Sequence, residues 1–263
     1  MKQIIASTSS AIRSEKKNFR VSNKAVSVLL LTPMLGVLLF TLAWFSPITT
    51  KYVQWLVKEN HPVEMLTFIF LMVGSILGAY LAYWIKSEKR EAPIIGLFLF
   101  LFSFGLFVIA MEEISWGQQF LGFLTPDSLN LINEQNETNL HNIKGLQGNS
   151  EYFHLFFGLA GAIGVWLNLF ILNKVRVPLI LSTWFLTIVA VSAVDLYNDF
   201  VPFEPEVGYF LRRLSEVNEM MIGFTAFAYV LLLSRKFRKP APPASLESKV
   251  ANEKFSPYMN IPL

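Results

Sequence analysis

The chain has 263 residues, of which 53% are hydrophobic and only 16% are charged, and its formal net charge is +3. Soluble domains carry about 25% charged residues, and the apolar residues here fall in long uninterrupted runs. The sequence therefore predicts an integral membrane protein and excludes disordered, collagen-like and disulfide-stapled classes. The absence of cysteine also excludes thiolate nucleophiles, iron–sulfur clusters and Cys-ligated zinc.

The first 24 residues form a basic, polar segment that contains Lys16, Lys17 and Arg20. We expect this segment to be mobile. It precedes the first apolar run, and it is too long to be the basic leader of a secretory signal peptide. We therefore interpret the first apolar run as a retained membrane helix.

Six apolar runs are long enough to cross a membrane. They cover residues 25–45, 62–85, 93–111, 154–172, 178–194 and 219–234. Each run has about 16–24 residues with almost no charge inside, close to the ~20 residues that a hydrocarbon core requires. The sixth is the shortest and could begin within the preceding loop. The sequence predicts an all-α fold, a polytopic bundle of six transmembrane helices spanning residues 25–234.

Charged residues divide unequally between the two sides of this predicted bundle. The N-terminal segment, the second and fourth loops and the tail 235–263 hold 17 of the 22 Lys and Arg. The other three loops, together with the ends of the spans that adjoin them, hold 14 of the 19 Asp and Glu. The positive-inside rule therefore places both termini in the cytoplasm. The Pro-containing tail is expected to be disordered. Acidic residues contribute little to topology, so their excess on the outer side needs another explanation.

The third loop, residues 112–153, is expected to form a partly helical extracytoplasmic cap. It begins with Met-Glu-Glu-Ile-Ser-Trp-Gly-Gln-Gln at the outer end of the third span. The adjacent carboxylates of Glu112 and Glu113 are costly to desolvate at a membrane boundary unless they are paired, protonated or bound to metal. The alternative is that both lie in the hydrated headgroup zone. Ser115 and Gln118 add polar groups beside them.

A second polar stretch of the cap covers residues 133–142. If this stretch is helical, Glu134, Glu137 and His141 share one face. A Glu and a His one turn apart can bind a divalent metal or act as an oriented acid and base. The alternative is a solvated polar helix.

Further acids and a histidine lie at the outer ends of the later spans. Glu151 and His154 form a Glu-x-x-His motif, as used in di-iron bundles, but a single copy is weak evidence. Asp195 lies at the end of the fifth span. Glu219 begins the sixth span without an obvious helical partner, whereas Glu216 is placed for an ordinary ion pair with Arg212.

The motifs at residues 112–118 and 137–142 carry a resemblance to known proteins. Glu-Glu-Ile-Ser-Trp-Gly-Gln and Glu-Thr-Asn-Leu-His-Asn resemble a pair of signatures shared by a set of bacterial polytopic membrane proteins, over residues 93–142. This resemblance implies a bacterial inner membrane and transfers no activity. A looser, architectural similarity is to alkaline ceramidase-like membrane hydrolases, which hold zinc near one membrane face. This chain lacks their paired His-x-x-x-His motif and has six predicted spans rather than seven.

The convergence of acids and histidines at one depth predicts a metal-dependent hydrolase or transferase that acts on a lipid or lipid-linked substrate. The expected catalytic residues are Glu112, Glu113, Glu137, His141 and Asp195. Glu113, Glu137 and His141 are the expected ligands of a divalent metal, with zinc favoured. Secondary candidates are Ser115, Gln118, Asn139, Asn142, His154, Glu216 and Glu219.

Three other functions compete with this one. The main alternative is a non-catalytic membrane subunit or binding module whose acidic cap recruits a partner protein or ligand. A di-iron oxidoreductase is disfavoured by the single Glu-x-x-His motif. Transport is disfavoured because no charged residue lies in the middle of a span. Basic patches occur only near the termini, where they indicate contact with the membrane surface and not with nucleic acid.

Overall fold

The computed structural model describes residues 2–88, 91–133, 135–140, 142–144, 149–166 and 173–237. Over these residues the regular structure is helical, apart from one isolated bridge between Asn133 and Ile143. The predicted all-α class is therefore confirmed. The expected disordered tail lies almost wholly outside the described residues.

Five helices are long and apolar enough to cross a membrane. They are α2 (Asn23–Trp44), α4 (Pro62–Ser87), α5 (Pro93–Glu113), α9 (Ser182–Phe200, preceded by a 3-10 turn over Leu179–Leu181) and α10 (Pro205–Phe237). The expected fourth span is represented by the 17-residue helix α8 (Ser150–Trp166), and the rest of that run, residues 167–172, lies outside the described residues. The structure thus supports five of the six expected spans.

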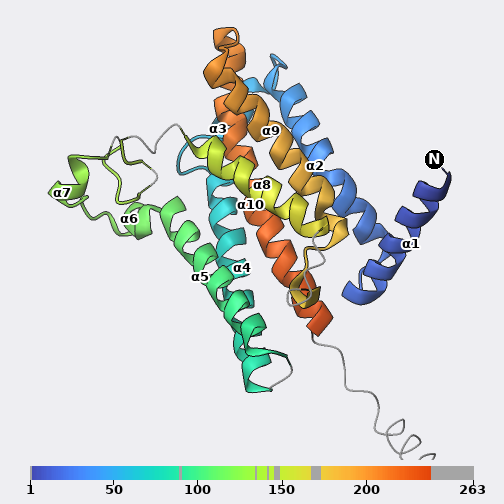
Figure 1. Ribbon diagram of the computed structural model, residues 1–263. Helices are drawn as coiled ribbons and strands as arrows, with labels where there is room; N and C mark the ends of the chain where they lie inside the picture. The colour runs from blue at the N-terminus through green and yellow to red at the C-terminus, as the bar shows by residue number, and fades with distance from the viewer. Residues whose placement is uncertain are drawn as a thin grey trace, which may run out of the picture.

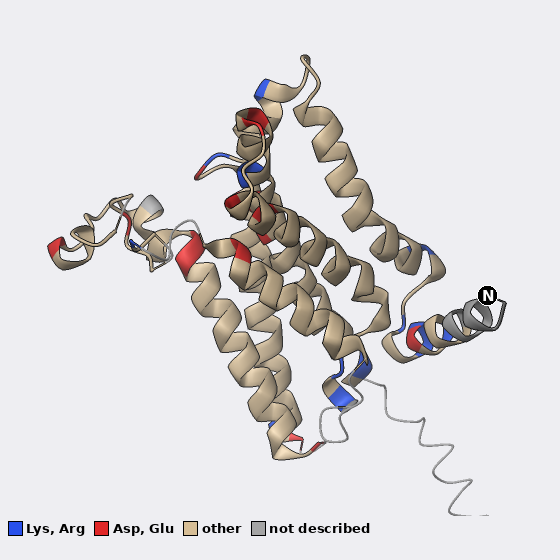
Figure 2. Cartoon of the chain, turned by 45° about the horizontal axis from the view of Figure 1, so that its top comes forward, with Lys and Arg blue, Asp and Glu red and all other residues tan. Residues whose placement is uncertain are grey.

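The long helices form one bundle. Helix α4 lies between α5 and α10, and α9 contacts α10, α8 and α2 (Figure 1). Helices α5 and α9 end at the same end of the bundle at which α4, α8 and α10 begin, and we call this the cap end. Acidic residues gather toward the cap end, and most basic residues lie toward the opposite end and on the N-terminal helix (Figure 2).

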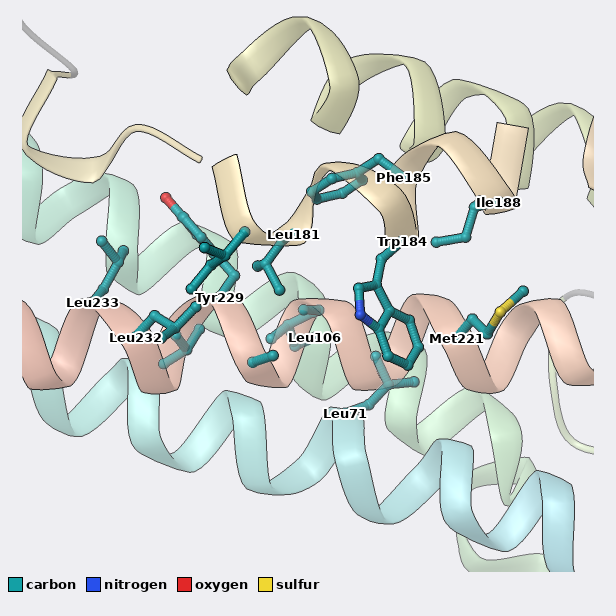
Figure 3. Packing of buried hydrophobic residues seen from close by; sticks show 14 of the residues in the cluster. Leu71, Leu106, Leu181, Trp184, Phe185, Ile188, Met221, Tyr229, Leu232 and Leu233 are labelled. Carbon is teal, nitrogen blue, oxygen red and sulfur yellow. The ribbon is translucent and has the colours of Figure 1, made fainter. Parts of the chain in front are cut away.

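Small residues recur at helical spacing in the second and fourth expected spans, at Gly74 and Gly78 and at Gly158 and Gly161, and this spacing predicts the close helix contacts that the structure has there. A Cβ atom on Gly78 would lie 2.2 Å from the Ser103 hydroxyl of α5, and one on Gly161 would lie 2.0 Å from the Phe185 ring of α9. Larger residues at these positions would force the helices apart. Around these contacts a buried apolar core fills the bundle (Figure 3); it includes Leu71, Leu106, Leu181, Trp184, Phe185, Ile188, Met221, Tyr229, Leu232 and Leu233.

The N-terminal segment, expected to be mobile, is helical from Lys2 to Phe19 (α1). The buried carboxylate of Glu15 accepts hydrogen bonds from Arg176 Nη2 at 3.1 Å and from the Ile180 amide at 3.3 Å. Burial raises the pKa of Glu15, and the Arg176 charge partly opposes this shift. The sequence does not reveal that α1 packs on the bundle, because the ion pair that holds it joins Glu15 to Arg176, more than 150 positions away.

Helix α10 begins at Pro205, well before the expected start of the sixth span at residue 219. The additional turns bury Phe210, Leu211, Leu214 and Val217 on one face while polar residues occupy the other. Such an amphipathic stretch is not an uninterrupted apolar run, so a search for apolar runs misses it. The predicted fifth loop is therefore mostly the first part of α10.

Candidate functional site

Residues 112–144 form the cap, which leaves the bundle at the end of α5. The chain turns there through three consecutive residues with positive φ: Ser115 (46°), Trp116 (55°) and Gly117 (89°). The cap contains only short helices, α6 (Gln118–Leu121) and α7 (Asp127–Asn130). Left-handed backbone at Ser and Trp is costly, and the contacts around this turn must therefore hold it in place.

Glu112 binds groups of the cap with both of its carboxylate oxygens. Oε1 accepts a hydrogen bond from Trp116 Nε1 at 2.6 Å, and Oε2 accepts one from the Leu140 amide at 2.5 Å. The second bond links residues 28 positions apart. Glu112 therefore holds the segment around Leu140 at the end of α5.

Glu137 is the centre of the same hydrogen-bond system. Its Oε2 atom accepts bonds from the Ser115 hydroxyl at 2.9 Å, from Asn139 Nδ2 at 2.7 Å and from Asn142 Nδ2 at 3.1 Å. Gln118 Oε1 accepts a further bond from the Thr138 amide at 2.7 Å. We call this set the cap network; it comprises Glu112, Ser115, Trp116, Gln118, Glu137, Asn139 and Asn142.

The helix expected over residues 133–142 does not form in the described part of this stretch. Asn133 Oδ1 accepts bonds from the amides of Gln135 and Glu137 at 3.0 and 3.1 Å, and Asn136 has a positive φ of 58°. Asparagine side chains compete with helical hydrogen bonds in this way. The helix on which the alignment of Glu134, Glu137 and His141 depended is therefore absent from the described residues.

Glu113 belongs to a different group of acids, at the cap end of the bundle. The charges that act on it most are those of Glu219 and Glu216 from α10, Glu64 from α4 and its neighbour Glu112. Carboxylates held this close repel one another, so the group requires shared protons, cations or polar partners to be stable. Three helices thus present acids to one place.

His154 of α8 connects this group of acids to α9. Its Nε2 atom lies 3.2 Å from Glu219 Oε1, and its Nδ1 atom lies 3.5 Å from the hydroxyl of Ser215. The Ser215 side chain also acts on Asp195 of α9. His154 and Asp195 are both buried. The cap end thus brings together Glu219, His154, Ser215 and Asp195.

We call these seven residues the bundle cluster: Glu64, Glu113, His154, Asp195, Ser215, Glu216 and Glu219. Two buried polar atoms near it have no hydrogen-bond partner, Oε1 of Glu151 and Oδ1 of Asn218. Burial raises the pKa of Glu151, and the charges of Asp199 and Asp195 add to this shift. Buried polar atoms without partners are rare in native proteins, and they often mark a place for water or a ligand group.

The structure separates the candidates that the sequence grouped together. Glu112, Glu137, Ser115, Gln118, Asn139 and Asn142 join the cap network, whereas Glu113, Asp195, His154, Glu216 and Glu219 join the bundle cluster. His141 lies outside the described residues. Two of the three expected metal ligands are thus separated, since Glu113 belongs to the bundle cluster and Glu137 to the cap network. Within the described part of the chain, no three His, Asp or Glu side chains are placed to hold one metal ion.

Sequence reasoning missed Ser215 and Glu64 and paired Arg212 incorrectly. Ser215 lies four residues before Glu219, on the same face of α10, and that spacing could have revealed it. Glu64 looked like an ordinary acid in the first turn of a helix. Arg212 acts on Asp195 of α9, and it is Arg213 that acts on Glu216.

Comparison with known proteins adds no family to this geometry. No family model, no curated protein and no solved structure matches the chain. The resemblance to bacterial membrane proteins and the looser one to ceramidase-like hydrolases therefore stay predictions. The geometry of the site and the apolar helices, which fit a lipid bilayer, are therefore the observations that bear on function.

Proposed function

We propose that the protein is an integral membrane hydrolase or transferase that acts on a lipid or lipid-linked substrate at the bundle cluster. The observation that carries this proposal is the position of His154, between a carboxylate on one ring nitrogen and a hydroxyl on the other. A histidine oriented by a carboxylate is the usual general base of hydrolases and transferases.

The proposed chemistry is proton transfer at a carbonyl or phosphoryl centre. His154 takes the proton of the attacking water or alcohol as the new bond to oxygen forms. A protonated carboxyl of the cluster, such as that of Glu113, gives a proton to the oxygen that leaves. After the product leaves, water returns the proton from His154 to the Glu113 carboxylate, so that both groups regain their starting states. Glu219 fixes the ring and stabilises its charged form, which is the role of the acid in a Ser-His-Asp triad.

The substrate class follows from the position of the cluster. It lies at the ends of helices whose outer surfaces are apolar, including exposed Phe100, Phe104 and Ile109 on α5. A substrate that reaches Glu113 from the surrounding bilayer must therefore combine an apolar tail with a polar reacting group. Lipids and lipid-linked compounds have this construction, which supports them over water-soluble substrates.

A zinc ion is the part of the expectation that this geometry supports least. Glu137 already accepts three hydrogen bonds within the cap network. Zinc binding through Glu137 and His141 stays a prediction, and no step of the proposed chemistry passes through a metal. Metal content of the purified protein and of a His141→Ala variant tests it, because a metal held there would be lost in the variant.

The proposal is tested by incubating the reconstituted protein with total bacterial lipid extract and analysing the lipids by mass spectrometry. We expect the wild-type protein to generate lipid products that His154→Ala and Glu219→Gln variants fail to generate. Asp127→Asn is the matched control, since Asp127 is an exposed acid in α7 outside both groups. Identical lipid profiles for wild type and His154→Ala would refute the enzymatic role and leave the binding module as the better explanation.

A further inference from the structure

The part of the cap that directly follows the turn after α5 exposes an unusual amount of apolar surface. Residues 118–132, which we call the cap arm, contain a single charged residue, Asp127. Leu124, Leu121 and Leu131 are 90%, 78% and 75% exposed, and Phe120, Phe123 and Ile132 are also exposed. A water-facing loop of this length would normally carry polar residues at such positions, and clustered exposed apolar residues mark an interaction surface.

The direction of the arm indicates what it contacts. Both views show the cap extending sideways from the end of α5, away from the other long helices (Figures 1 and 2). It thus reaches over the region next to α5 and does not close over the end of the bundle. The half of α5 nearer the cap is itself apolar and exposed, with Phe104, Phe107 and Ile109 among its residues. In a membrane that side faces acyl chains, and the arm lies where the lipid headgroups begin.

The cap network gives the arm a defined shape without using its apolar residues. Gln118, at the start of the arm, donates a bond to Thr125 Oγ1 at 3.1 Å and accepts one from the Thr138 amide at 2.7 Å. Lys144 closes its other end, because its amide donates to the Ile132 carbonyl at 2.8 Å. The polar groups are therefore directed inward and the leucines outward.

We infer that the cap arm is a membrane-binding element that inserts its Leu and Phe side chains into the lipid leaflet beside α5. Short amphipathic segments bind the interface between headgroups and acyl chains by burying such residues. A lipid surface fits better than a protein partner for two reasons. The apolar surface of the arm continues the apolar surface of α5, and the arm has almost no charge with which to select a partner. This inference is independent of the proposed activity.

Because the chain contains no cysteine, the inference can be tested with single-cysteine variants and no background substitutions. Leu124→Cys and Leu131→Cys are labelled with the environment-sensitive fluorophore NBD and reconstituted into phosphatidylethanolamine–phosphatidylglycerol vesicles. Phe104→Cys on the exposed side of α5 is the lipid-facing reference, and Lys58→Cys in the exposed turn before α4 is the water-facing reference. Quenching is then measured with lipids that carry a doxyl group near the headgroup.

We expect NBD at both arm positions to emit at shorter wavelength than at Lys58 and to be quenched several-fold more strongly. Emission and quenching equal to those at Lys58 would overturn the inference, because the arm would then lie in water. A blue shift without quenching by doxyl lipids would also overturn it, because the arm would then be covered by protein, either a partner or a second copy of the chain.

Discussion

Glu112 and Glu113 are neighbours in the sequence, but they belong to two regions that treat negative charge in opposite ways. In the cap network, each described carboxylate is surrounded by N–H and O–H donors: Glu112 accepts from Trp116 and Leu140, and Glu137 accepts from three side chains. In the bundle cluster, the charges that act on Glu113 are those of other carboxylates, Glu219, Glu64 and Glu216 among them.

This difference distinguishes acids that build structure from acids that are candidates for chemistry. A carboxylate that accepts several hydrogen bonds from its own fold stabilises that fold and keeps fewer acceptor sites for a substrate. A carboxylate held next to other carboxylates costs stability, and folded proteins retain such arrangements chiefly at functional sites. We therefore expect mutations in the cap network to lower the stability of the cap, and mutations in the bundle cluster to lower activity.

The largest effect is expected for His154→Ala. If His154 is the general base, its loss lowers the rate of lipid product formation by about 10²–10⁴-fold. The helix should remain folded, since α8 packs on α9 mainly through other residues, such as Gly158 and Gly161. Rates are compared with the Asp127→Asn control by mass spectrometry of the products. A rate within twofold of the control would place the chemistry elsewhere.

Glu137→Ala is expected to loosen the cap without changing the long helices. Three donors lose their shared acceptor, which should cost the cap about 3 kcal/mol of local stability. Limited proteolysis should cut the variant within residues 115–144 much faster than the wild type. Equal cleavage rates would show that the network does not hold the cap.

A smaller effect of the same kind is expected for Trp116→Phe. Phenylalanine keeps most of the apolar contact but removes the Nε1 donor to Glu112, a loss of about 1 kcal/mol. The proteolysis rate should lie between those of the wild type and Glu137→Ala. A variant as sensitive as Glu137→Ala would instead point to a packing role for the indole ring.

The smallest effect concerns pH and Glu151. Because burial raises its pKa in the folded protein, the folded state binds a proton there more tightly than the unfolded chain does. This contribution to the free energy of unfolding is present at low pH and is lost as pH rises through the folded-state pKa. Glu151→Gln should remove it, so the thermal unfolding midpoint of the variant should fall less than that of the wild type between about pH 5 and about pH 8. Parallel curves would contradict this.

The sequence was sufficient for the features that depend on long apolar runs and glycine spacing. It predicted the all-α class and the close contacts at Gly78 and Gly161, because lipid as a solvent imposes both. It missed the early start of α10, where one apolar face alternates with polar residues. It also expected a helix around Glu137, where Asn133 instead caps the amides of the loop.

The candidate site was predicted only in part, because grouping by depth does not say which side chains meet. Asp195, His154, Glu216 and Glu219 were correctly placed at one end of the bundle. That His154 lies between Glu219 and Ser215 depends on how α8 packs against α10, and no local pattern encodes this packing. Glu112 and Glu113 end α5, where successive side chains point about 100° apart, and which of the two meets the cap depends on the turn at Ser115–Gly117.

The most direct test of the contrast between the two regions is hydrogen exchange at the Thr138 and Leu140 amides in Glu112→Ala and Glu113→Ala variants. The Leu140 amide donates to Glu112, and the Thr138 amide donates to the neighbouring Gln118. We predict that both amides exchange much faster in Glu112→Ala and at the wild-type rate in Glu113→Ala. Equal acceleration in the two variants would contradict the assignment of these adjacent acids to separate regions.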